Sequence, residues 1–186
     1  METPNPQSRR YSHGAITLHW LVAVLIMANF VLVWTAEGKP EAEEHFLVGL
    51  HAATGIMILL LSVLRVIWRI THPAPPLEPG LKPWEVVLAT WVHRIFYILI
   101  IAVPFTGWLM SSAASGGKGV NIYGLFDFPG LPIGPDRDTA IAIYEVHETL
   151  ATVMFFMMIL HLLAALKHHF VDRDATLGRM IPFLRR

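Results

Sequence analysis

The sequence predicts an all-α membrane protein, a bundle of four transmembrane helices with both termini in the cytoplasm. Three observations predict it. Hydrophobic side chains make up 54% of the 186 residues and charged ones only 15%, which is more apolar surface than a soluble domain of this size can bury. Four apolar stretches are each long enough to cross a bilayer as a helix, which takes about 20 residues. The basic residues gather on the segments of one side of these stretches.

The four predicted spans cover residues 15–36, 46–70, 86–112 and 140–167 of a single membrane domain, 1–186. Arg9 and Arg10 precede the first apolar stretch, as in a signal peptide. That stretch is too long for such a peptide, however, and Trp34-Thr35-Ala36 is no cleavage site, so we expect it to be retained. Pro104 interrupts the third stretch and predicts a kink within one span. Residues 113–138 are expected to form a periplasmic loop, and residues 170–186 a cytoplasmic tail.

The orientation follows from the basic residues, which favour cytoplasmic segments. Eleven of the fourteen lie at the two ends of the chain or around the second connector: Arg9, Arg10, Arg65, Arg69, Lys82, Arg94, Lys167, Arg173, Arg179, Arg185 and Arg186. The other two connectors contain only Lys39, Lys118 and Arg137. We therefore expect the odd-numbered spans to run outward and the even-numbered ones inward.

Composition also excludes several classes of function. Lys plus Arg and Asp plus Glu both number 14, so the chain lacks the basic excess that nucleic-acid binding requires. There is no cysteine, which excludes disulfides, thiolate catalysis and iron–sulfur clusters. Histidine is abundant, at ten copies. Ionisable side chains inside a membrane span are rare and usually functional, so the histidines are the candidate site residues.

Four histidines lie inside the predicted spans at two matching depths. His19 and His161 are close to the cytoplasmic ends of the first and fourth spans, whereas His51 and His147 are close to the outer ends of the second and fourth. His161 follows His147 by 14 positions, which corresponds to a rise of about 21 Å and places both imidazoles on one side of the helix. The predicted pairs are therefore His19 with His161 and His51 with His147.

Two imidazoles that face each other at one depth can hold a planar haem between them, one on each axial face of the iron. Each of the four histidines is followed four residues later by Ala or Gly, which leaves room for a flat ring along the helix; these residues are Ala23, Gly55, Ala151 and Ala165. A tetrahedral metal site would instead require three or four converging ligands. The simpler alternative is that each histidine forms a hydrogen bond between helices.

The other histidines lie at or beyond the span ends, where solvated imidazoles are common: His13, His45, His72, His168 and His169. His93 differs, because together with Arg94 it lies inside the start of the third span. We interpret it as a candidate contact for a haem propionate or a quinone, or as part of an interfacial pair.

These residues lie in segments that resemble the bacterial cytochrome b561 family over nearly the whole chain. The most specific are Val146-His147-Glu148-Thr149 and the run from Leu160-His161 to Lys167-His168-His169; the others are Thr17-Leu18-His19-Trp20, 49–55, 64–73 and 93–107. The resemblance implies an inner-membrane cytochrome with two b-type haems as cofactors. It also implies axial ligation of the haem irons by the same four histidines, His19, His51, His147 and His161.

The resemblance further implies electron transport between a donor and the quinone pool, with ubiquinone as substrate. Some members of the family oxidise periplasmic superoxide, which implies a superoxide oxidase type of oxidoreductase. Candidate quinone or propionate contacts are His93, Arg94, Arg65 and His13. Two alternatives stay open: a cytochrome b subunit that docks a dehydrogenase or hydrogenase and has no activity of its own, and a haem-free transporter lined with histidine.

Overall fold

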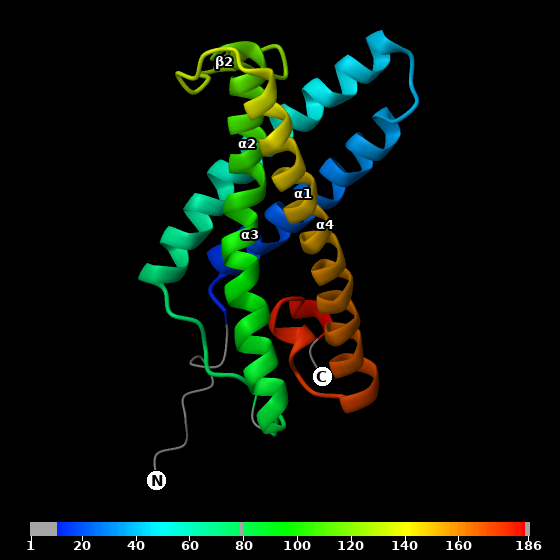
Figure 1. Cartoon of the computed structure of the whole chain (residues 1–186). Helices are drawn as coiled ribbons and strands as arrows, with labels where there is room; N and C mark the ends of the chain where they lie inside the picture. Colours follow the sequence, from blue (N-terminus) through cyan, green and yellow to red (C-terminus); the bar gives the residue numbers. More distant parts are fainter. Residues whose placement is uncertain (1–10, 79, 185–186) are drawn as a thin grey trace.

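Four long helices make up most of the computed structural model, which describes residues 11–78 and 80–184. Figure 1 shows them as α1 (His13–Ala36), α2 (Glu41–Thr71), α3 (Pro83–Ser115) and α4 (Arg137–Lys167). All four are long and apolar enough to cross a membrane. Each contains one of the predicted apolar stretches, and α3 continues through Pro104 as a single helix. The predicted all-α membrane architecture is confirmed.

The bundle has two ends, to which we give names. The terminal face is formed by residues 11–13, 71–78, 80–83 and 167–184, where α1 and α3 begin and α2 and α4 end; the loop face is formed by residues 36–41 and 115–137. Arginines 9, 10, 185 and 186, which contribute to the orientation argument, lie outside the described residues. The cytoplasmic location of the terminal face therefore stays a prediction.

Side chains placed just before two of the helices explain where these begin. Ser12 precedes α1, and its hydroxyl accepts a hydrogen bond from the backbone N–H of Ala15 over 3.3 Å. Asp136 precedes α4 and accepts from the N–H groups of Asp138 and Thr139. These bonds satisfy N–H groups that lack a partner in the first turn of a helix. Hydrogen bonds from the Thr139 hydroxyl and N–H also hold the pKa of Asp136 below its usual value.

The helices pack as two pairs. α1 lies along α2 and α3 along α4, and the pairs meet mainly where α2 contacts α3; Figure 1 shows one pair crossing the other at an angle. All four helices contribute to the central core, which contains Val22, Ile26, Ile58, Leu99, Ile100, Val103 and Met154. Many large apolar side chains face outward instead, as expected of helices that are surrounded by lipid.

A short β-hairpin lies on the loop face, where the sequence analysis predicts only a loop. β1 (Val120–Ile122) pairs antiparallel with β2 (Phe126–Phe128). Tyr123 and Gly124 both have positive φ, of 52° and 77°, and Leu125 N–H bonds the carbonyl of Ile122 over 2.9 Å, as in the type I′ turns that suit a hairpin. Three-residue strands are too short to show an alternating pattern, so the sequence analysis missed them.

The hairpin is held against α2. The side chains of Val120 and Ile122 are buried together with Ala53 and Ile56 of α2, and the Tyr123 hydroxyl lies 2.9 Å from that of Thr54. The hairpin thus covers the part of α2 that follows His51.

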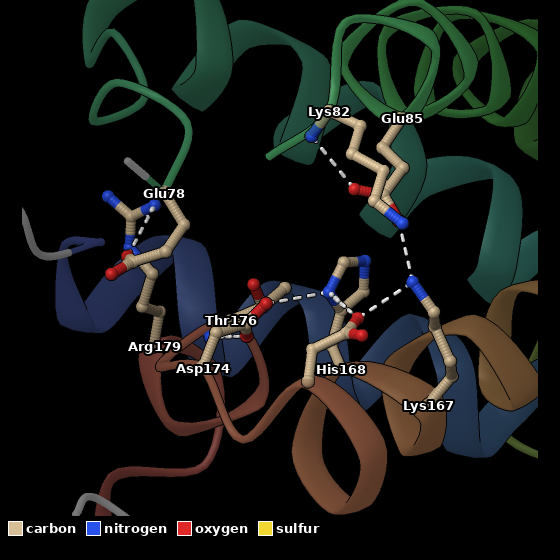
Figure 2. A network of polar contacts seen from close by, with 9 residues as sticks. Glu78, Lys82, Glu85, Lys167, His168, Asp174, Thr176 and Arg179 are labelled. Carbon is tan, nitrogen blue, oxygen red and sulfur yellow. Dashed lines mark hydrogen bonds and ion pairs between the residues drawn. The ribbon is translucent and has the colours of Figure 1, made fainter. Parts of the chain in front are cut away.

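On the terminal face, the chain after α4 turns back under the bundle. A π-helical turn, η2 (His168–Asp172), follows α4 directly. Figure 2 shows the ion pairs that hold it: Lys167 Nζ lies 2.6 Å from Glu85 of α3 and 2.7 Å from Asp172, and His168 Nδ1 lies 2.7 Å from Asp174. These contacts join the end of α4 to the beginning of α3.

Two further contacts hold the rest of this segment, which includes the short 3₁₀ helices η3 (Leu177–Arg179) and η4 (Pro182–Leu184). Arg179 donates to the carbonyl of Pro76 over 2.7 Å and lies 3.8 Å from Glu78, both in the α2–α3 connector. The indole N–H of Trp20 in α1 donates to the carbonyl of Met180 over 2.9 Å. The segment after α4 therefore contacts α1 as well as the connector.

Gly14 allows α1 to approach the Trp68 side chain of α2. A Cβ atom at position 14 would overlap the indole ring, whose N–H donates to Ser12 Oγ over 3.0 Å. We expect Gly14→Ala to lower the free energy of unfolding by about 1–3 kcal/mol, because the ring must shift in a packed contact. Thermal unfolding in detergent would measure this change. Gly49→Ala is the control, because a Cβ there meets no atom within 4 Å; equal effects would contradict the prediction.

Candidate cofactor sites

The four histidines inside the helices form two pairs near opposite ends of the bundle. The ring centroids of His19 in α1 and His161 in α4 are 6.5 Å apart, and those of His51 in α2 and His147 in α4 are 6.3 Å apart. All four side chains are partly buried. Each pair joins one helix of the α1–α2 pair to α4. The structure thus brings together the same histidines that the sequence analysis pairs by depth.

The spacing within each pair fits one metal ion held between two imidazoles. Two metal–nitrogen bonds of about 2 Å each, together with the distance from each ring nitrogen to its ring centre, give a centroid separation of about 6 Å. The ring planes meet at 56° and 90°, which this arrangement allows because each axial ligand can rotate about its bond to the metal. A pair of this kind leaves the four equatorial positions for a macrocycle.

At the loop-face pair, the backbone holds both rings ready to bind through Nε2. His51 Nδ1 lies 3.2 Å from the carbonyl oxygen of Asn29, and His147 Nδ1 lies 2.9 Å from that of Val103. A carbonyl oxygen only accepts, so each Nδ1 carries the proton and donates it. In the neutral ring Nε2 then has a free lone pair for a metal, with the orienting second partner that ligating histidines usually have.

Gly107 makes the position of the His147 ring possible. A Cβ atom there would lie 3.1 Å from Cε1 and 3.4 Å from Nδ1 of the ring. With only hydrogen on the α-carbon, the imidazole can lie against α3 and reach the Val103 carbonyl one turn earlier. The hydroxyl of Thr106 lies 3.1 Å from the same Nδ1. Gly107 ends the segment 93–107 that carries the family resemblance, but nothing in the sequence around it indicates this role.

At the terminal-face pair, the nearest partner is a cation. Arg65 Nη2 lies 3.0 Å from His19 Nδ1, and the guanidinium lies 5.5 Å from the centre of the Tyr97 ring. A guanidinium only donates, so Nδ1 accepts in this contact and the proton of the neutral ring lies on Nε2. Ligation through Nε2 requires the proton to lie on Nδ1 instead. The guanidinium must then move away from Nδ1, which its long side chain permits. The 6.5 Å spacing of this pair fits a haem iron between the two rings, and Arg65 puts a positive charge beside it.

Comparison with known proteins identifies the family to which this arrangement belongs. The family model for prokaryotic cytochrome b561 matches residues 10–183. The chain belongs to the prokaryotic cytochrome b561 family. It is a multi-pass membrane cytochrome of the b type, and membership implies that it binds b-type haem.

Several relatives in this family match nearly the whole chain. It is 33% identical to cytochrome b561 homolog 2 of Escherichia coli K12 over 176 residues, which cover 92% of this chain and 91% of the relative. A protein of Yersinia pestis named as a probable superoxide oxidase, CybB, is 32% identical, with 94% of this chain and 97% of the relative covered. Cytochrome b562 of Cereibacter sphaeroides is 26% identical, with 94% and 97% covered.

Of the other candidate contacts in this cytochrome, two lie beside a histidine pair: Arg65 and His93. The ring centroid of His93 is 5.5 Å from that of His161, with the planes at 90°. Arg65 contacts His19, as described above. Arg94 is exposed, 5.2 Å from the centre of the Trp91 ring, and His13 is exposed at the first residue of α1. The structure thus places His93 and Arg65 beside the terminal-face pair and leaves Arg94 and His13 on the surface.

A metal held by three or more side chains is not found at either pair. Within residues 11–78 and 80–184, one group of three His, Asp or Glu side chains has its ligand atoms close enough to share an ion: His168, Asp172 and Asp174 on the terminal face. These side chains already form ion pairs with one another and with Lys167. The geometry of the four helical histidines therefore favours two two-ligand sites over a tetrahedral site.

Proposed function

We propose that this cytochrome binds two haems b, one at each histidine pair, and carries electrons between the two faces of the membrane. The observation that carries the proposal is the pair of centroid separations, 6.5 Å and 6.3 Å, at opposite ends of one bundle. Bound haem iron supplies reversible one-electron oxidation and reduction. Family membership and the name of the Yersinia pestis relative support the same activity.

The residues of the chain have three tasks in this function. His51 and His147 provide Nε2 lone pairs, because the carbonyls of Asn29 and Val103 hold these two rings in the ligating tautomer. His161 and His19 would provide the other two, His19 once Arg65 has moved away from its Nδ1. The offset of 14 positions between His147 and His161 in α4 separates the two levels by about 21 Å along the helix. Between these levels lies the apolar core of the four helices, which keeps water away from the path between the sites.

We further propose that the terminal face is cytoplasmic, in the bacterial inner membrane, and that electrons pass from a periplasmic one-electron donor to ubiquinone. The donor is superoxide or a periplasmic redox partner. On the terminal side, His93 and Arg65 provide polar groups beside the His19–His161 pair. A cavity of about 480 Å³ lies between α2 and α3 and is lined by Arg69, Tyr97 and apolar side chains. It supports access for an apolar substrate near Arg65. Arg94 and His13 remain candidate contacts at the membrane surface.

Superoxide oxidation is tested on the purified protein in phospholipid vesicles with a ubiquinone analogue. Two superoxide anions are oxidised to oxygen, and their two electrons reduce one quinone to quinol, which takes up two protons. We expect quinol to form with superoxide in this ratio, and protein without haem to form none. Haem that superoxide reduces, without quinol formation, would instead support a subunit that passes electrons to a docked enzyme. If the purified protein held no haem under any condition, the haem-free transporter would be favoured.

A further inference from the structure

The two histidine pairs differ in the charge of their surroundings. At the terminal-face pair, the partly buried guanidinium of Arg65 lies 3.0 Å from Nδ1 of His19, whose ring centroid is 6.5 Å from that of His161. No ion pair with a carboxylate is recorded for Arg65 among residues 11–78 and 80–184. Within the described part of the chain, no acidic side chain therefore compensates the positive charge at this site.

The loop-face pair has neutral partners. His51 and His147 each direct Nδ1 at a backbone carbonyl oxygen, and the additional partner of His147 is the Thr106 hydroxyl. A carbonyl oxygen that accepts the N–H of a ligating imidazole makes the ring more basic. A more basic ligand donates more electron density to the metal and stabilises its oxidised form.

These two environments act on a bound iron in opposite directions. Oxidised iron carries one more positive charge than reduced iron, so a nearby fixed cation disfavours the oxidised state. The interaction is strong in the low-dielectric interior of a membrane protein, and local charge and hydrogen bonds to the ligands are among the means by which a protein sets a haem potential. Arg65 therefore raises the reduction potential at the terminal face, whereas the carbonyl partners lower it at the loop face.

We propose that Arg65 is a tuning residue that makes the terminal-face haem the better electron acceptor of the two, so that electrons flow from the loop face to the terminal face. The proposal rests on the two-haem function above and names the residue that gives the proposed electron flow its direction. In the transfer, iron at the loop-face site is oxidised by one electron and iron at the terminal-face site is reduced by one electron.

Redox titration of variants that retain one haem tests the role of Arg65. In a His147→Ala background, which leaves the terminal-face haem, we expect Arg65→Gln to lower the equilibrium constant for reduction of that haem at least tenfold. For a one-electron couple this lowers the midpoint potential by about 59 mV. In a His161→Ala background, which leaves the loop-face haem, the same change should not move the midpoint. Arg65→Lys keeps the charge and should restore most of the potential.

Arg69→Gln is the matched control for loss of one positive charge. Arg69 lies one turn further along α2 and is exposed, so its removal should shift the terminal-face midpoint less than the removal of Arg65 does. An unshifted or raised terminal-face midpoint in Arg65→Gln, or an equal shift at both sites, would overturn the role of Arg65. A wild-type protein that binds fewer than two haems would instead overturn the proposed function.

A second variant covers the case in which Arg65→Gln no longer binds the terminal-face haem. Arg69→Glu leaves Arg65 in place and puts a carboxylate four residues away on the same helix face, where it can pair with the guanidinium. We expect the terminal-face midpoint to fall further in this variant than in Arg69→Gln. If Arg69→Glu left the midpoint unchanged, the charge of Arg65 would not set the potential.

Discussion

Replacement of His161 with alanine is expected to halve the haem content of the purified protein, from two haems per chain to one. Alanine removes one of the two nitrogens at the terminal-face pair, where the ring centroids are 6.5 Å apart, and leaves the loop-face pair intact. His147→Ala should also leave one haem, in this case the one at the terminal face. The haem-to-protein ratio is measured from the reduced absorption spectrum, and the two single-haem variants should differ in midpoint potential.

The controls for this experiment are histidines that the structure places outside the pairs. His45 lies near the start of α2, and His168 is held by Asp172 and Asp174 on the terminal face. His45→Ala and His168→Ala should each retain two haems. Equal loss from all four variants would contradict the ligand assignment. His93→Ala is the most stringent comparison, because its ring centroid lies only 5.5 Å from that of His161; it should keep both haems, although the potential of one can change.

Gly107→Val is expected to remove the loop-face haem while the terminal-face haem stays bound. The added Cβ would lie 3.1 Å from Cε1 of His147, and the two further methyl groups of valine leave no room for the ring beside α3. The imidazole would then lose its hydrogen bond to the Val103 carbonyl and its alignment with His51. Gly107→Ala should have a smaller effect, because a shift of a few tenths of an ångström relieves its contact.

The measurement is again the number of haems per chain, combined with the midpoint potential of the haem that remains. The retained terminal-face haem shows in the same sample that the bundle has folded. Gly49→Val is the control for the cost of valine in a helix, since nothing lies within 4 Å of a Cβ at that position. A Gly107→Val protein with two haems of unchanged potential would show that the glycine has no part in positioning His147.

Much of this architecture is visible in the sequence because the membrane imposes simple rules. Each long apolar stretch must form a helix, since only then are its backbone polar groups satisfied in lipid. The depth of a histidine follows from its distance to the end of such a stretch. For this reason the pairing of His19 with His161 and of His51 with His147 is predictable, and the structure places these rings 6.5 Å and 6.3 Å apart.

Other features depend on contacts between residues that are distant in the sequence. Nothing local to Gly107 indicates that the ring of His147, forty residues later, lies against it. The β-hairpin is likewise too short to be recognised from a pattern, and it is held in place by the burial of Val120 and Ile122 against α2. The segment after α4 is positioned by ion pairs and hydrogen bonds to other segments, among them Lys167 with Glu85.

The sequence by itself determined the four helices and the depths of the histidines, because length, hydropathy and helical rise act along a single chain. Only the tertiary structure decided what each imidazole meets at its second nitrogen: a carbonyl of another helix at His51 and His147, and the guanidinium of Arg65 at His19. These partners lie on helices other than that of the ring they contact. Which of them meets which ring depends on how the helices cross and rotate, and the packing of side chains between the helices sets both.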